Sequence, residues 1–214
     1  MIFNLSAQNT IANQFLSELR DKNVQSDRSR FRGNMKRLGQ LMAYEISKKL
    51  AFRDSVIETP LGKSFVSVPA TQPVLLTVMR AGIPYFDGFL DFFNTSECGF
   101  IGAYREEGSD DIVIHLEYVA TPDVEGKDVI IIDPMLATGK SFVRAVQAIV
   151  KRGVPAHIYI AALVAAPEGI EFVRTNLNVP FSIYTCALDE NLNPQYYIVP
   201  GLGDAGDLSY GVKL

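Results

Sequence analysis

The most regular hydrophobic pattern in the chain is a run of four β-branched residues, 129–132, which follows Lys127-Asp128 and ends before Pro134. A continuous apolar run of this length, without alternation, indicates a strand buried on both faces, as in a parallel sheet covered by helices. Apolar residues then recur at helical spacing from Ser141 to Lys151. The pattern therefore predicts a strand, a turn at the carboxyl edge of a sheet, and a helix.

The same two periodicities along the rest of the chain predict an α/β fold. We expect strands at Val56–Glu58, Phe65–Val68, Val74–Val78, Phe100–Tyr104, Ile112–Tyr118, Val129–Ile132, His157–Leu163 and Phe181–Thr185. We expect helices at Ala7–Leu19, Arg28–Leu50 (capped by Ser26 or Asp27), Tyr85–Phe93, Ser141–Lys151 and Glu168–Leu177. Helices between strands predict a mostly parallel central sheet flanked by helices. With 214 residues and 48% hydrophobic content, one domain over residues 1–214 is expected.

The turn after the 129–132 strand has the composition of a phosphate-binding loop. The first backbone N–H groups of the following helix point outward without intrahelical partners, and such a helix end attracts phosphate. Thr138 and Ser141 would add hydroxyl donors, and Gly139 would let the backbone approach an anion closely. Asp133 would hold ribose hydroxyls. The loop therefore predicts a site for a ribose 5-phosphate.

Two other interpretations of this loop stay open at the level of its residues. Thr138-Gly139-Lys140-Ser141 copies the end of the Walker A pattern of nucleoside triphosphatases, G-x-x-x-x-G-K-[ST]. That pattern needs glycine at position 134, where Pro134 has a fixed φ and no N–H for a phosphate. An ordinary connection between a strand and a helix is the other interpretation, but it gives no reason for an acid beside a hydroxyl-rich turn.

The segment 129–141 resembles the phosphoribosyl diphosphate loop of the phosphoribosyltransferases. At the other end of the chain, the eleven-residue string Tyr197–Asp207 resembles the uracil-binding segment of the uracil phosphoribosyltransferases. Val164–Ile170, Met79–Gly82 and Gly102–Arg105 are also similar to that family. The resemblance runs in order over nearly the whole chain.

The resemblance implies a type I phosphoribosyltransferase fold with a β-hairpin arm near residues 112–119. It further implies a helical N-terminal arm over residues 1–52 and a small C-terminal base-binding region over residues 186–214. The implied reaction is pyrimidine salvage, in which the 5-phosphoribosyl group of phosphoribosyl diphosphate passes to uracil and gives UMP and diphosphate.

The site residues implied by the resemblance fall into two groups. Phosphoribosyl diphosphate would be bound by Arg80, Arg105, Asp133, Pro134, Met135, Leu136, Ala137, Thr138, Gly139, Lys140, Ser141 and Asp204. Uracil would be bound by Ile198, Gly203, Asp204 and Ala205, and the catalytic set would be Arg80, Arg105 and Asp204.

The chemistry of these residue types agrees with those roles. The planar guanidinium of arginine stays charged and donates two bonds at once, which suits a diphosphate. Arg80 and Arg105 each follow an apolar strand, where ligand sites of α/β folds assemble. Taken alone, each arginine would fit a surface salt bridge equally well. The glycines of residues 201–206 would let backbone groups approach the carbonyl and N–H groups of uracil.

Two positions depart from the family pattern. Lys140 stands where the family commonly has a second glycine after Thr138-Gly139, so it either adds charge near the 5-phosphate or restricts the loop. Leu208-Ser209-Tyr210 replaces the basic and aromatic residues usual after Gly206-Asp207, so contacts there are not carried over.

Composition excludes several other classes of protein. The net charge of −4 argues against a nucleic-acid surface, and the basic residues of 28–37 lie on the polar side of a helical pattern. The longest apolar tract, Ile158–Pro167, is far shorter than the about 20 residues that span a bilayer. Cys98 and Cys186 lack metal-ligand spacing and fit a reducing compartment, so a cytoplasmic location is expected.

Mg²⁺ is expected to bind together with phosphoribosyl diphosphate, although no carboxylate cage for a metal is visible in the sequence. The resemblance also suggests a homo-oligomer and a GTP effector. Two other functions stay open: a non-catalytic nucleotide-binding regulator of the same fold, which the retained arginines and acidic balance disfavour, and a P-loop kinase, which Pro134 disfavours.

Overall fold

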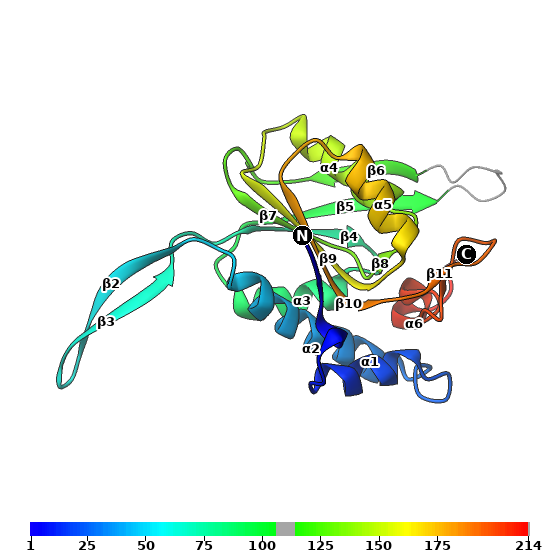
Figure 1. Ribbon diagram of the computed structural model, residues 1–214, viewed down its shortest axis with the longest axis horizontal. Helices are drawn as coiled ribbons and strands as arrows, with labels where there is room; N and C mark the ends of the chain where they lie inside the picture. The colour runs from blue at the N-terminus through cyan, green and yellow to red at the C-terminus, as the bar shows by residue number, and fades with distance from the viewer. Residues whose placement is uncertain (106–113, 214) are drawn as a thin grey trace.

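The computed structural model describes residues 1–105 and 114–213, and their central feature is an eight-stranded sheet (Figure 1). Its strands are β1 (Ile2–Asn4), β4 (Val74–Met79), β5 (Cys98–Arg105), β6 (Ile114–Ala120), β7 (Asp128–Ile132), β8 (Met135–Leu136), β9 (His157–Ala165) and β10 (Phe181–Leu188). The order is β1-β10-β9-β7-β4-β5-β6, with β8 added to β9, and every pair is parallel except β5 with β6. The predicted α/β class with a mostly parallel sheet is confirmed.

Helices cover both faces of the sheet (Figure 1). One face carries α4 (Lys140–Val150) and α5 (Pro167–Asn176), and the other carries α1 (Ala12–Arg20), α2 (Arg28–Ser47) and α3 (Ile83–Phe92). In β7, Val129 and Ile131 pack with the first layer, whereas Ile130 and Ile132 pack with the second. All four side chains are fully buried, so the prediction of a strand buried on both faces is confirmed.

Polar side chains accept backbone hydrogen bonds near the start of each N-terminal helical segment. Of the two residues expected to cap α2, Asp27 does so, because its Oδ1 accepts from the backbone N–H groups of Ser29 and Arg30 at 3.0 and 3.1 Å. The expected start of the first helix at Ala7 was wrong. Asn4 caps a separate 3-10 turn, η1 (Leu5–Ala7), so α1 begins only at Ala12, where the Thr10 hydroxyl accepts from the backbone N–H at 3.3 Å.

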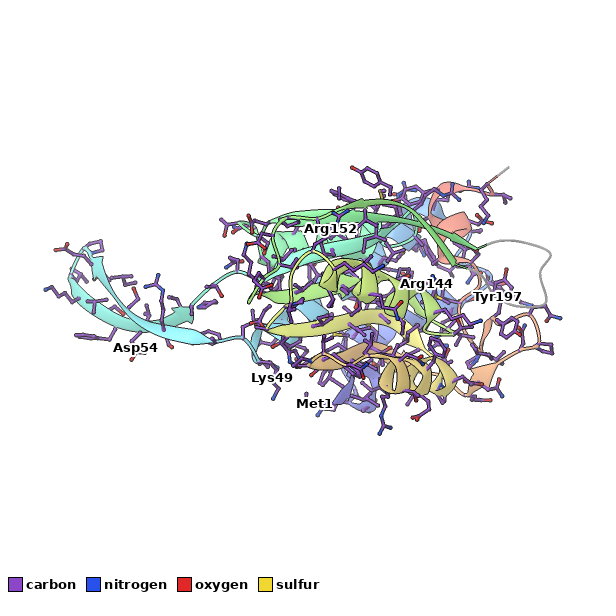
Figure 2. All side chains as sticks on the ribbon, turned by 90° about the horizontal axis from the view of Figure 1, so that it is seen from above. Met1, Lys49, Asp54, Arg144, Arg152 and Tyr197 are labelled. Atoms are coloured by element: carbon purple, nitrogen blue, oxygen red, sulfur yellow. The ribbon has the colours of Figure 1, made fainter. Side chains whose placement is uncertain are left out.

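A long hairpin, formed by β2 (Phe52–Thr59) and β3 (Gly62–Pro69), projects from the body as a separate two-stranded sheet (Figure 1). The strands expected at Val56–Glu58 and Phe65–Val68 are only parts of this arm. Figure 2 shows the arm, marked by Asp54, at one end of the molecule and Tyr197 at the other.

The described part of the hairpin expected near residues 112–119 is an antiparallel pair of strands. Its second strand, β6, pairs antiparallel with β5 and forms an edge of the central sheet, while residues 106–113 lie outside the described part of the chain. The β2–β3 arm is a further hairpin, which the sequence did not predict as an arm.

Three C-terminal elements and one N-terminal strand were not predicted. β11 (Asn191–Leu192) pairs antiparallel with β12 (Ile198–Val199), and the chain then forms α6 (Ala205–Tyr210) beside α2. At the other terminus, β1 adds to the edge of the sheet by pairing with β10. Within the described ranges, none of the helices has the length and apolar character needed to cross a membrane.

Candidate functional site

The loop between β7 and α4 surrounds a small polar cavity at the carboxyl edge of the sheet. The cavity has a volume of about 130 Å³ and is lined by Asp133, Met135, Ala137, Thr138, Gly139, Ser141 and Phe142. Five of the expected phosphate-loop residues besides Asp133 therefore share one cavity with that acid. The segment that was predicted to bind a ribose 5-phosphate has a concave site of its own.

Backbone contacts fix the shape of this loop. The Pro134 carbonyl accepts from the N–H groups of Leu163 and Val164 at 3.0 and 3.1 Å, and the Leu136 carbonyl accepts from Ala166 at 3.0 Å. Gly139 begins α4 with φ +74°, and a Cβ there would lie 2.6 Å from the Gly169 carbonyl oxygen. Only glycine fits this position without moving α5.

The remaining expected loop residues lie outside the cavity lining. Pro134 and Leu136 are buried against the sheet, where they hold the loop rather than face the cavity. Lys140 is half-buried at the first position of α4.

Asp133 is the acidic residue of the cavity, and its pKa is raised. Its Oδ1 accepts from the backbone N–H of Met135 at 3.2 Å. Burial raises the pKa of Asp133 to about 7, and this single hydrogen bond offsets only part of the effect. The side chain therefore changes between a neutral and a charged form near neutral pH.

A second cavity of about 160 Å³ adjoins the first. It is lined by Ala81, Met135, Ala137, Tyr196, Tyr197, Ile198, Gly203, Asp204, Ala205 and Gly206. All four residues expected at the base site line it. Met135 and Ala137 line both cavities, so the phosphate loop and the C-terminal segment border adjacent cavities.

Tyr196 and Tyr197 line the second cavity although they were not among the expected site residues. Their side chains are 41% and 47% exposed, so they present ring surface to a ligand. Tyr196 adopts φ 63°, which is rare for a residue with a side chain. Asn193 Oδ1 holds the turn by accepting from the N–H groups of Gln195 and Tyr197 at 3.0 and 2.9 Å. The Asn-Pro turn signal before the tyrosines was the available clue.

The glycine-rich segment, residues 198–206, contains two glycines in backbone conformations that residues with a side chain rarely adopt. Gly201 and Gly203 have φ values of +61° and +90°. Asp204 is exposed and caps α6, since its Oδ1 accepts from the backbone N–H of Asp207 at 2.9 Å.

Arg80 follows β4 and lines neither cavity, although the next residue, Ala81, lines the second. The guanidinium Nη2 is 3.4 Å from Asp207 Oδ1 and 3.5 Å from the Gly211 carbonyl oxygen. With 45% of its side chain exposed, Arg80 can still contact an anion. Arg105 ends β5 at the same edge of the sheet, but its side chain lies outside the described part of the structure.

The described residues contain no group of three or more His, Cys, Asp or Glu side chains that could hold a metal ion. The anionic groups of the site, Asp133 and Asp204, line separate cavities.

Comparison with known proteins gives the same family as the motifs. Residues 6–212 match the uracil phosphoribosyltransferase family. The chain is 44% identical to the uracil phosphoribosyltransferase of Porphyromonas gingivalis over 214 residues, which cover 100% of this chain and 99% of the relative.

Solved structures support the fold. A protein from Aquifex aeolicus matches with a TM-score of 0.88 and 29% identity over 100% of both chains. A hypoxanthine-guanine phosphoribosyltransferase from Bacillus anthracis matches with a TM-score of 0.50 and 12% identity, over 76% of this chain and 80% of its own, which shows shared fold alone. The family match over residues 6–212 and the 44% identity over the full chain establish that the chain belongs to the uracil phosphoribosyltransferase family.

Proposed function

We propose that the protein transfers the 5-phosphoribosyl group from phosphoribosyl diphosphate to uracil and releases UMP and diphosphate. The observation that carries this proposal is that the two cavities lie side by side and share Met135 and Ala137 in their walls. A ribose phosphate in the first cavity and a planar base in the second would place the reacting carbon and nitrogen next to each other. Such positioning supplies a large part of the rate acceleration in a two-substrate reaction.

The first cavity would hold the 5-phosphate and the ribose. The N–H groups at the start of α4 and the hydroxyls of Thr138 and Ser141 are the donors for the phosphate. Asp133 would accept from the ribose hydroxyls in its charged form. Pro134 and Leu136 would act by keeping the loop on β9.

The second cavity would hold uracil. Its rim carries the rings of Tyr196 and Tyr197, which offer flat apolar surface to a planar base. Backbone groups of Ile198, Gly203 and Ala205 would read the two carbonyls and the N–H of uracil, because glycine allows close approach. Asp204, which lines this cavity, would face both the base and the sugar.

The positive charge of the site would stabilise the leaving diphosphate. Breaking the bond between C1 and the diphosphate produces an oxocarbenium-like sugar and a strongly anionic leaving group. Arg80 and Arg105 at the carboxyl ends of β4 and β5 would donate to that group as its charge develops. No nucleophilic side chain is needed for this reaction.

Mg²⁺ would enter bound to phosphoribosyl diphosphate and would neutralise part of its charge. This ion usually keeps several waters and uses one or two carboxylates together with substrate phosphates, so Asp133 and Asp204 are the carboxylates that would serve it. Asp133 and Asp204 would reach it through water or sugar hydroxyls.

A homo-oligomer is supported by the arm. Val56 and Phe65 stand opposite each other in the register of β2 and β3, and their side chains are 54% and 80% exposed. Leu61 at the tip is 100% exposed. Exposed apolar surface of this kind marks an interaction site, and a second copy of the chain is the occupant we propose. A GTP effector and a cytoplasmic location stay predictions.

The test is nucleotide formation by the purified protein with Mg²⁺ and phosphoribosyl diphosphate. Uracil, cytosine, thymine, hypoxanthine and orotate are offered separately, and ATP hydrolysis is measured in parallel. UMP formed from uracil supports the proposal. Binding of phosphoribosyl diphosphate without product from any base would favour a non-catalytic regulator, and ATP hydrolysis would favour a P-loop enzyme.

A further inference from the structure

An ion pair links the end of the first helix to the segment before the base cavity. Arg20, the last residue of α1, donates from Nη2 to Asp189 Oδ1 at 2.6 Å and from Nη1 to Asp189 Oδ2 at 2.9 Å. The side chains are 22% and 4% exposed, so the carboxylate is almost fully removed from water. Two parallel bonds of this kind fix both the distance and the orientation of the partners.

Both partners also bind the backbone of Gly201. The Gly201 N–H donates to Asp189 Oδ2 at 2.9 Å, and the Gly201 carbonyl accepts from Arg20 Nη1 at 3.1 Å. The N–H and the C=O of one residue are therefore satisfied by one ion pair. Gly201 lies between Ile198 and Gly203, which both line the base cavity.

A second side chain from the same part of the chain holds the next residue. Gln25 Nε2 donates to the Leu202 carbonyl at 3.2 Å and to the Leu19 carbonyl at 2.9 Å. The amide thus bridges α1 and the glycine-rich segment. Leu202 is 3% exposed and packs in the core, so this end of the segment is fixed as well.

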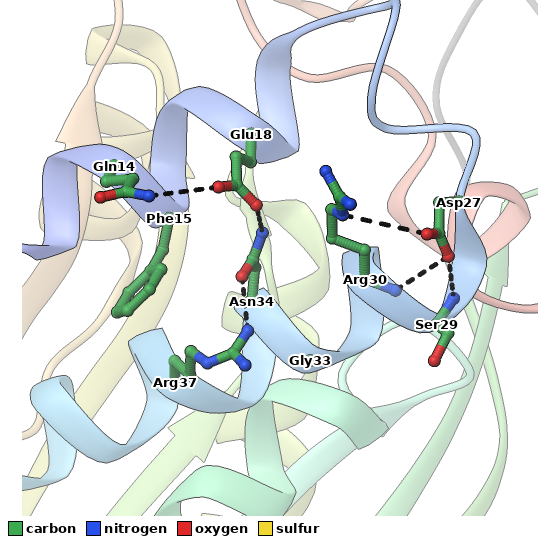
Figure 3. A pocket seen from close by; sticks show the side chains of 9 residues that line it. All are labelled: Gln14, Phe15, Glu18, Asp27, Ser29, Arg30, Gly33, Asn34 and Arg37. Carbon is green, nitrogen blue, oxygen red and sulfur yellow. Dashed lines mark hydrogen bonds and ion pairs between the residues drawn. The ribbon is translucent and has the colours of Figure 1, made fainter.

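The helix that carries Arg20 is itself anchored to α2 (Figure 3). Glu18 Oε2 accepts from Asn34 Nδ2 at 2.8 Å, and Asn34 Oδ1 accepts from Arg37 Nη1 at 2.8 Å. The Arg37 guanidinium lies 5.4 Å from the centre of the Phe15 ring. Movement of α1 would break these contacts, so Arg20 is presented to Asp189 from a fixed position.

We propose that Arg20 and Asp189 are positioning residues that set the geometry of the uracil cavity and thereby the selection of the base. Neither side chain lines the cavity. Their action passes through Gly201, whose position determines where the backbone groups between Ile198 and Gly203 meet the base. This inference rests on the proposed function, because it assigns a role in uracil binding.

The conservative variants separate geometry from charge. Arg20→Lys keeps the positive charge, but an ammonium group does not form the two parallel bonds. Asp189→Asn keeps the shape of the side chain, but it loses the charge and one of the two acceptors. Asp91→Asn is the matched control, since it breaks the Lys36–Asp91 ion pair of 3.0 Å between α2 and α3, away from the glycine-rich segment.

The experiment measures steady-state UMP formation with each substrate varied in turn. A misplacement of about 1 Å costs up to ~100-fold in rate, so we expect the KM for uracil to rise at least ~10-fold in Arg20→Lys and Asp189→Asn. We expect the KM for phosphoribosyl diphosphate to change less than about twofold, because the phosphate loop is held by β9 and α5 instead. The preference for uracil over thymine, measured as the ratio of kcat/KM values, should fall in both variants and stay constant in Asp91→Asn.

The inference is overturned if both variants keep the wild-type KM for uracil and the wild-type base preference. It is also overturned if the KM for phosphoribosyl diphosphate rises as much as the KM for uracil. Should a variant be inactive, hydrogen exchange decides: faster exchange confined to residues 198–206 supports the inference, and unchanged exchange there overturns it. The wild-type enzyme is assayed first, because absence of UMP from wild type contradicts the proposed function. In that case the positioning inference is tested by hydrogen exchange of residues 198–206 and by the affinity for uracil, measured in wild type and in both variants.

Discussion

Gly169 faces the carbonyl group of Ala137 so closely that a Cβ on Gly169 would overlap the Ala137 oxygen. The contact joins the first turn of α5 to the loop that surrounds the phosphate cavity. Gly169→Ala would push this loop away from the sheet. We expect the KM for phosphoribosyl diphosphate to rise about tenfold or more, and overpacking to lower the free energy of unfolding by about 1–3 kcal/mol.

Gly33→Ala is the control for Gly169→Ala. A Cβ on Gly33 would lie 3.5 Å from Arg37 Nη1, an ordinary contact, and Gly33 is inside α2. Alanine there should stabilise the protein by about 0.5–1 kcal/mol without changing either KM. Wild-type kinetics in Gly169→Ala would show that the loop does not depend on this contact.

Asp133 makes stability depend on pH in an unusual direction for a carboxylate. Its pKa is raised from 3.8 to about 7, so the folded protein keeps a proton that the unfolded chain has lost between these values. This contribution to stability is fully present below about pH 4 and is lost as the pH rises through about 7. Because the side chain is only partly buried, we expect the loss to be on the order of 1–2 kcal/mol.

Urea unfolding at several pH values checks the prediction for Asp133. The decrease in stability toward pH 8 should be smaller in Asp133→Asn than in wild type. Binding of phosphoribosyl diphosphate should show the opposite trend, because ribose hydroxyls donate better to a charged carboxylate. Identical pH profiles for wild type and variant would contradict both parts.

Replacing Arg80 should lower kcat strongly and change the free energy of unfolding only slightly. Its bonds to Asp207 and Gly211 are long, 3.4 and 3.5 Å, and 45% of the side chain is exposed, so Arg80→Ala should lower stability by less than about 1 kcal/mol. Loss of a donor to the leaving diphosphate should lower kcat by about 100- to 1,000-fold. Arg174→Ala, which breaks an exposed pair of 3.4 Å with Glu171 on α5, serves as control. A wild-type kcat in Arg80→Ala would show that this arginine does not stabilise the leaving diphosphate.

Lys140 departs from the family pattern at the first position of α4. We expect Lys140→Gly to retain UMP formation, because the backbone N–H groups remain and the family commonly uses glycine there. The substitution should cost the helix up to about 1 kcal/mol in stability. The kcat/KM for phosphoribosyl diphosphate measures the outcome, and complete loss of activity would show that the lysine is essential in this chain.

Sequence alone predicted the layers and the phosphate loop because these depend on local periodicity. The run 129–132 could only be buried on both sides, and the sheet places Ile130 and Ile131 against opposite layers as a pleated strand requires. Asp27 capped its helix for an equally local reason. The loop after β7 then had to lie at the carboxyl edge of the sheet.

The missed features depend on contacts between distant residues. β1 is three residues long and forms a strand only by pairing with β10. No local sequence pattern predicts that pairing. The Arg20–Asp189 pair joins residues 169 positions apart, and each looks like an ordinary surface charge in sequence. Tyr196 was missed since its unusual φ is imposed by the turn at Asn193. The arm was located only in part, because its strands have no buried face to give them a regular pattern.

The β2–β3 arm has a consequence for how the protein responds to dilution. Two-stranded hairpins are marginally stable in water, and among the described residues Val56 and Phe65 are 54% and 80% exposed. The order of Phe52–Pro69 should therefore depend on protein concentration, whereas the central sheet should not. At low concentration the amides of the arm would exchange first, and the exposed strands would then favour non-specific association between chains.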